Sequence, residues 1–160
     1  MDKHFINKLP ADVLNIILAF SYKPQSQKLL QEINKQAIKN NRIIKCLFQM
    51  YIAQEETKFG LLSNELHEIL ENPILAELKN IQIVGLMGMA SFTEDKNQIS
   101  KEFTSLAQLF QELKTNQTAM HLGNVSWEEL SMGMSGDYTI AAELGSTLVR
   151  VGSAIYGARN

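Results

Sequence analysis

Three short stretches of the chain combine glycine with residues that can donate hydrogen bonds to an anion. They are GLMGMA at 85–90, SMGMSGD at 131–137 and RVGSAIYG at 150–157. Glycine lets backbone N–H groups approach a ligand closely, and serine adds a hydroxyl donor. If each stretch follows a strand, the three meet at one edge of a parallel sheet, where ligands bind. The pattern favours a phosphate site; the alternative is that the glycines only permit turns.

The serines and an arginine of these stretches are the candidate ligands of such an anion. Ser131, Ser135 and Ser153 carry the hydroxyl groups. Arg150 stands between apolar residues in VRVG, and a charged side chain in such a place needs a partner or a ligand. Two interpretations stay open: Arg150 donates hydrogen bonds to a ligand at the pocket mouth, or it pairs with Glu143 at the rim.

The segments that position these residues alternate between helix and strand patterns. Helical spacing of apolar residues, with Ser26 as a possible first cap, is found at 26–41, 63–72, 99–113 and 137–145. Apolar runs typical of strands covered on both faces lie at 42–53, 81–90, 130–135 and 146–152. This alternation predicts an α/β fold with a parallel sheet and helical crossovers, either a barrel or an open sheet.

Composition limits the class of protein and its partners. The chain has 160 residues, a net charge of −2, three histidines and one cysteine. A slightly negative charge provides no basic field for nucleic acid or an anionic membrane. The single cysteine, Cys46, excludes an internal disulfide, and the polar start MDKHFINKLP is not a signal peptide, so we expect a cytoplasmic protein. The scattered histidines and cysteine do not form a metal site.

The C-terminal part of the chain resembles a known family. LSMGMSGDYTIAAELGSTLVRVGSAIYGAR (130–159) resembles the signature of the pyridoxal phosphate homeostasis proteins, the YggS-like family. That signature is S-M-G-M-S-x-D, a short helix, and then G-S-T-x-V-R-x-G-[ST]-A-I-[FY]-G. IVGLMGMASFTED (83–95) resembles the family's G-L-M-x-M-A segment, and IAQEETKFGL (52–61) resembles its I-A-x-E-x-x-K-x-G segment. The resemblance extends from about Ser26 to Arg159.

This resemblance implies a β/α barrel like that of the alanine racemases, holding one pyridoxal 5′-phosphate (PLP). Members of the YggS-like family are regarded as carriers or regulators of free PLP without an assigned catalytic activity. The resemblance therefore implies a PLP-binding protein of intracellular PLP homeostasis that is not an enzyme. Carried over by motif, the phosphate would be held by Ser131, Ser135, Gly152 and Ser153, the pyridine nitrogen would face Arg150, and the barrel mouth would be lined by Met87 and Met89.

The first quarter of the chain departs from the family. The A-V-S-K-x-x-P segment, whose lysine forms the Schiff base, and the F-G-E-N motif are both absent. In the preferred alignment, HFINKL (4–9) matches the family's third-strand H-F-I-G-H-L, and the usual Schiff-base lysine is missing. In a second alignment, LPADVLNIILAFSYKP (9–24) matches the first strand with gaps and makes Lys23 the candidate lysine.

We therefore expect a family member that is truncated on its N-terminal side. A divergent segment at 1–25 precedes the C-terminal part of a PLP-binding barrel at 26–160. Missing strands leave an incomplete TIM-type parallel β/α barrel of about five strands, with open edges. VLNIILAF (13–20) has helical spacing and would cover one edge as a helix. The expected assembly is a monomer or a weak homodimer formed through an edge.

Alternative functions stay open beside non-covalent PLP binding. A racemase-like PLP enzyme would need the Schiff base and acid/base groups on both faces of the cofactor. A non-functional truncated family member is the other alternative. Glu55, Glu56 and Lys58 are expected to form a charged turn at a strand end that faces solvent rather than the cofactor.

Overall fold

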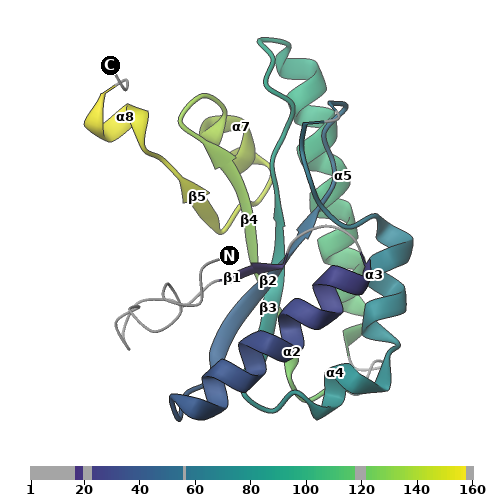
Figure 1. Cartoon of the computed structure of the whole chain (residues 1–160). Helices are drawn as coiled ribbons and strands as arrows, with labels where there is room; N and C mark the ends of the chain where they lie inside the picture. The colour runs from purple at the N-terminus through teal and green to yellow at the C-terminus, as the bar shows by residue number, and fades with distance from the viewer. Residues whose placement is uncertain (1–16, 20–22, 56, 118–121, 158–160) are drawn as a thin grey trace.

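Parallel strands alternate with helices along the chain (Figure 1). The computed structural model describes residues 17–19, 23–55, 57–117 and 122–157, with the backbone alone for 17–19 and 23–26. The strands are β1 (Ile17–Ala19), β2 (Ile44–Met50), β3 (Ile81–Gly88), β4 (Val125–Met134) and β5 (Leu148–Arg150). The helices are α2 (Lys23–Lys39), α3 (Ser63–Leu70), α4 (Pro73–Glu77), α5 (Lys96–Thr115), α7 (Tyr138–Glu143) and α8 (Ser153–Tyr156).

The sheet has the order β1-β2-β3-β4-β5, and every neighbouring pair is parallel. Because strands that follow each other in the chain are neighbours in the sheet, right-handed crossovers place the connecting helices on one face of the sheet. On that face the main core joins Phe48 of β2 to Leu30 of α2 and Phe103 of α5. The other face carries a smaller cluster around Leu47 and Met87. Helices on one face are typical of a β/α barrel rather than an open sheet, so the predicted partial barrel is confirmed.

The start of the sheet differs from the prediction. Ile17–Ala19 form strand β1, paired with Cys46–Phe48 of β2, instead of belonging to a covering helix. An open strand edge offers unpaired backbone groups, which favours strand pairing over a helix there. The rest of 13–20 and the HFINKL alignment lie outside the described residues. Helix α2 begins at Lys23, so Ser26 lies inside the helix and the predicted Ser26 cap is wrong.

Strand β4 is longer than its apolar pattern suggested. It starts at Val125, five residues before the predicted 130–135 strand, and its Trp127 is buried in the main core. The sequence pattern missed this extension, because the polar residues Glu128 and Glu129 interrupt the apolar run.

In β2, burial raises the pKa of the Cys46 thiol to about 12, so this cysteine is unreactive. Within the described ranges, no helix has both the length and the apolar character needed to cross a membrane.

Candidate functional site

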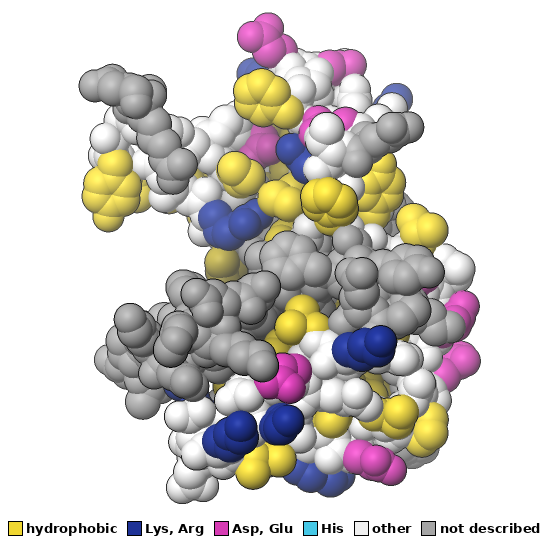
Figure 2. All heavy atoms as spheres, in the orientation of Figure 1, with side chains coloured by type: hydrophobic (Ala, Val, Ile, Leu, Met, Phe, Trp, Pro, Cys, Tyr) yellow, Lys and Arg dark blue, Asp and Glu magenta, His cyan; other side chains and the backbone are white. Residues whose placement is uncertain are grey.

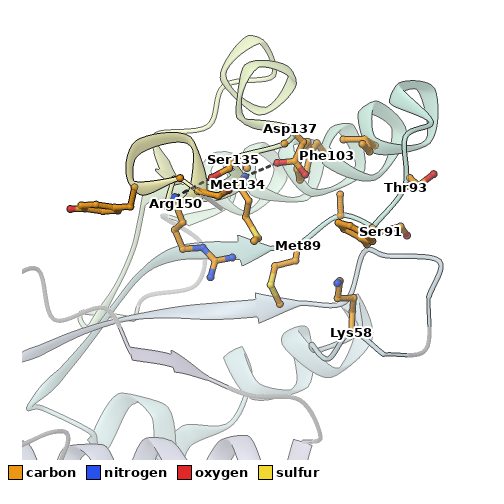
Figure 3. Close-up of a pocket in the computed structure, with 18 residues that line it drawn as sticks. Lys58, Met89, Ser91, Thr93, Phe103, Met134, Ser135, Asp137 and Arg150 are labelled. Atoms are coloured by element: carbon orange, nitrogen blue, oxygen red, sulfur yellow. Dashed lines mark hydrogen bonds between the residues drawn. The ribbon is translucent and has the colours of Figure 1, made fainter. Parts of the chain in front are cut away.

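A pocket of about 670 Å³ opens at the carboxyl ends of strands β2 to β5 (Figure 3). Its wall is formed by Lys58 after β2, 89–93 after β3, 133–137 at the end of β4, and residues of 150–157 at the end of β5. Helix α5 adds two apolar side chains to it. Figure 2 shows hydrophobic and basic side chains side by side on the face turned to the viewer. The three glycine-containing stretches of the sequence therefore surround one pocket.

Serine and glycine residues form one end of this pocket. The Ser135 Oγ accepts hydrogen bonds from the N–H groups of Gly152 at 3.1 Å and Ala154 at 3.3 Å. These bonds fix the loop after β4 against the segment after β5. A Cβ added at Gly136 or Gly152 would meet nothing within 4 Å, so open space lies beside this backbone. Ser153 lines the same end, which therefore offers hydroxyl donors and room for a small ligand.

Arg150, the last residue of β5, extends into the pocket (Figure 3). Its Nη2 donates a weak hydrogen bond to the Met87 Sδ at 3.9 Å. Partial burial in the pocket wall lowers the pKa of the guanidinium, and the charge of Asp137 acts in the opposite direction. Among the described residues its charged neighbour is Asp137, so the alternative pairing with Glu143 is not what the structure shows. Arg150 keeps its charge at any physiological pH and has donors left for a ligand.

The turn after β4 depends on Asp137 and Gly133. The Asp137 Oδ1 accepts a hydrogen bond from the Met134 N–H at 2.6 Å, which closes the SMGMSGD turn. Gly133 has a φ of +99°, in the region that favours glycine. A Cβ at this position would lie 2.6 Å from the Ala141 Cβ of α7. The glycine therefore serves a close approach of strand and helix, and its role is to shape the pocket wall.

Gly133→Ala is expected to lower the free energy of unfolding by about 2–3 kcal/mol, because the strained φ and the contact with Ala141 both act against it. Gly136→Ala is the matched control in the same turn, since its Cβ would meet nothing. Urea unfolding of the three proteins measures the difference. Equal stability of the two variants would contradict this account of the turn.

Lys58 lies on the opposite wall from Arg150, with Met89 between them (Figure 3). Lys58 is partly exposed, as a solvated turn requires, and it also lines the pocket, because the loop after β2 folds back on its own strand. The Gln49 Nε2 donates a hydrogen bond to the Phe59 carbonyl at 2.7 Å. Gly60 packs so tightly that a Cβ would lie 2.3 Å from the Met50 carbonyl carbon. This packing turns Lys58 toward the pocket.

Glu55 joins two loops of this wall. Its carboxylate accepts a hydrogen bond from the Phe92 N–H at 2.7 Å and forms an ion pair with the Lys58 Nζ at 3.0 Å. Hydrogen bonds from Thr57, Phe92 and Lys58 lower the pKa of Glu55 to about 2. Glu55 is therefore charged at neutral pH, and it holds both the Lys58 ammonium and the loop after β3.

The depressed pKa of Glu55 predicts a specific acid sensitivity. Its stabilising effect is fully present above the ordinary pKa of 4.5 and is lost as the pH falls toward 2, because only the unfolded chain takes up the proton in that interval. Thermal unfolding measured by circular dichroism from pH 6 to 2 tests this. Glu55→Gln is expected to weaken the decline in melting temperature between about pH 4.5 and 2. An unchanged decline would show that Glu55 does not contribute.

Glu102 is a site residue that sequence reasoning missed. It is only 4% exposed and lies on α5. Its carboxylate accepts hydrogen bonds from the Ser91 N–H at 2.7 Å, the Ser91 hydroxyl at 2.8 Å and the Gln54 N–H at 3.1 Å. Glu102 thus ties the ends of β2 and β3 to the helix. Its spacing was the available signal, since it shares a helical face with Ile99 and Leu106.

The structure brings most of the predicted site residues together. Those that line the pocket are Ser135, Arg150, Gly152, Ser153 and Met89. Ser131 of β4 and Met87 of β3 are paired in register and lie side by side; both are buried and are not part of the lining. Lys23 begins α2, and its side chain lies outside the described residues. Within the described ranges, no group of three histidine, cysteine or acidic residues could hold a metal ion.

Residues 24–160 match the model of the alanine racemase N-terminal domain, so the chain belongs to this family. Within the family it belongs with the pyridoxal phosphate homeostasis proteins. It is 32% identical over 162 residues to the pyridoxal phosphate homeostasis protein of Aquifex aeolicus, covering 99% of this chain and 68% of that protein. The human protein of the same name is 37% identical over 165 residues, covering 100% of this chain and 56% of that protein.

Solved structures share the fold. PipY of Synechococcus elongatus with PLP bound has a TM-score of 0.74 and 24% identity, covering 98% of this chain and 67% of that chain. An alanine racemase from Corynebacterium glutamicum has a TM-score of 0.59 and 14% identity, covering 90% of this chain and 36% of that one. The chain therefore has the alanine racemase N-terminal-like fold, over part of the length of each of these proteins.

Proposed function

We propose that this chain binds PLP in the described pocket and acts in intracellular PLP homeostasis. The observation that carries the proposal is the meeting of Ser135, Gly152, Ser153 and Arg150 in one pocket. Hydroxyl groups, backbone amides and a guanidinium are the donors that a phosphate ester and a ring nitrogen require. The names of the relatives from Aquifex aeolicus and Homo sapiens support the same function.

The residues of the pocket fit the cofactor in charge and in polarity. The phosphate would be held by Ser135, Gly152 and Ser153, and Arg150 would face the pyridine nitrogen. Ile99 and Phe103 on α5 give an apolar wall, which suits an aromatic ring. When bound, PLP supplies a reactive aldehyde. The chain's own task in this proposal is to hold that group by non-covalent contacts and to release it.

Non-covalent binding agrees with the state of Lys58, the lysine among the described residues that line the pocket. Its Nζ is ion-paired with the Glu55 carboxylate at 3.0 Å, and an amine held in an ion pair is not free to attack an aldehyde. Reduction with borohydride in the presence of PLP, followed by mass mapping, tests this. No lysine should be modified stoichiometrically. A stoichiometric adduct on Lys58 or Lys23 would refute the non-covalent mode while retaining PLP as the ligand.

The phosphate should dominate recognition. Pyridoxine 5′-phosphate, which has no aldehyde, is expected to bind at least about 100-fold more tightly than pyridoxine, because charge-assisted hydrogen bonds contribute roughly 1.5–3 kcal/mol each. Titration calorimetry with both compounds measures the ratio. Equal affinities, or no binding of either, would refute the proposed site.

The absence of turnover is part of the proposal. Tyr156, which lines the pocket, is 88% exposed, so it is not held in place for proton transfer to a ligand. Incubation of the protein with PLP and either enantiomer of alanine should give no racemisation.

We further propose a cytoplasmic monomer or weak homodimer, since β5 at one end of the sheet pairs with β4 alone among the described strands. Sedimentation measures the assembly.

A further inference from the structure

The pocket is larger than PLP requires and is charged at both ends. Its volume is about 670 Å³. The sixteen non-hydrogen atoms of PLP would fill only about 480 Å³ even if each took as much room as a water molecule, roughly 30 Å³. Arg150 and Lys58 extend into it from opposite sides, with Met89 between them (Figure 3). If the phosphate and the ring occupy the Arg150 side, the Lys58 side has room for a further ligand group.

At this second end, Lys58 is the cationic donor. The Ser91 hydroxyl donates to Glu102 at 2.8 Å, whereas the Thr93 Oγ1 accepts from the Asp95 N–H at 3.1 Å and keeps its own proton as a neutral donor. An ammonium has three donors, and among the described residues Lys58 has one ion-pair partner, Glu55. Its side chain is 26% exposed, which leaves the group accessible from the pocket.

The chemical class of the extra group follows from this charge. An accessible ammonium at a pocket wall favours a carboxylate, and every α-amino acid that can be joined to the pyridoxyl group carries a carboxylate on the carbon next to the amine. Glu55 offsets part of the Lys58 charge, so the gain in affinity should be moderate. The hydrogen bonds that Glu55 accepts from Phe92 and Thr57 occupy its own oxygens and reduce their repulsion of a ligand carboxylate.

We propose that Lys58 forms a carboxylate subsite, and that the pocket therefore prefers phosphopyridoxyl amino acids to phosphopyridoxyl compounds without a carboxylate. This inference rests on the proposed binding of PLP at the Arg150 end. It extends the ligand class from the free cofactor to its amino-acid derivatives. Lys58 acts as a binding cation in this subsite, and no covalent bond to it is formed.

Titration calorimetry with two stable probes tests the inference. N-phosphopyridoxyl-L-alanine carries the carboxylate, and pyridoxamine 5′-phosphate lacks it. The wild-type chain is expected to bind the alanine derivative about tenfold more tightly. In Lys58→Gln this ratio should fall to about one, and Lys58→Arg should restore most of it. Lys39→Gln, at the exposed end of α2, is the matched control and should keep the tenfold ratio.

The outcomes separate the inference from the proposed function. Binding of pyridoxamine phosphate without preference for the alanine derivative overturns the carboxylate subsite alone. A tenfold preference that persists in Lys58→Gln overturns the role of Lys58. If the wild-type chain binds neither probe, the proposed function fails and the inference fails with it. Melting curves of each variant confirm that the comparison is made on folded protein.

Discussion

Arg150→Met is expected to weaken PLP binding about 100-fold. The guanidinium is the cation that would donate to the pyridine nitrogen of PLP, and a hydrogen bond that involves a charged group contributes roughly 1.5–3 kcal/mol. A loss of about 2.7 kcal/mol corresponds to a factor of 100 in the dissociation constant. Methionine keeps an unbranched stem of similar shape, so the change removes the charge and the donors more than the packing. Titration calorimetry with PLP measures the effect.

Arg150→Lys is the graded control for this prediction. Lysine keeps the charge but loses the planar arrangement of donors, so an intermediate loss of about tenfold is expected. The fold should be unaffected in both variants, because Arg150 is the exposed last residue of β5. If Arg150→Met binds PLP as tightly as the wild-type chain, the guanidinium does not contact the ligand.

Glu102→Ala is expected to lower the free energy of unfolding by about 3 kcal/mol. The substitution leaves the Ser91 N–H and hydroxyl without their acceptor, while the Gln54 N–H keeps only the Ser91 Oγ at 2.9 Å, and buried donors without a partner are costly. Urea unfolding measures the change. Glu112→Ala is the matched control, since Glu112 is an exposed glutamate on the same helix and should cost less than about 0.5 kcal/mol.

The same substitution should also weaken PLP binding, because Glu102 holds the loops after β2 and β3 that form one pocket wall. Glu102→Gln keeps one acceptor oxygen and should lie between the wild-type chain and Glu102→Ala in stability. A Glu102→Ala variant as stable as Glu112→Ala would mean that water satisfies the freed donors. In that case Glu102 does not maintain the pocket wall.

Much of the fold could be predicted from the sequence because its signals are local. The apolar stripe of Ile99, Phe103 and Leu106 marked α5, and the continuous apolar run at 81–90 marked β3. Alternation of such segments implied parallel strands, and small residues at the strand ends implied a ligand site there. Since the carboxyl ends of parallel strands share one sheet edge, 131–137 and 150–157 were expected to meet, and they do.

What could not be predicted depends on contacts between distant segments. Lys58 faces the pocket because Gly60 packs on the Met50 backbone and Gln49 holds the Phe59 carbonyl, neither of which is visible in a charged turn. Strand β1 formed where helical spacing favoured a helix, because the edge of β2 offered backbone partners. Glu102 was overlooked because charged residues are usually exposed, yet here four donors surround it.

A crystal structure of this chain grown with PLP tests the central claim most directly. The account predicts that the phosphate lies between Ser135 and the segment Gly152–Ser153, with Arg150 at the pyridine nitrogen and no covalent bond to Lys58. PLP bound elsewhere, or a pocket that stays empty at saturating PLP, would contradict it.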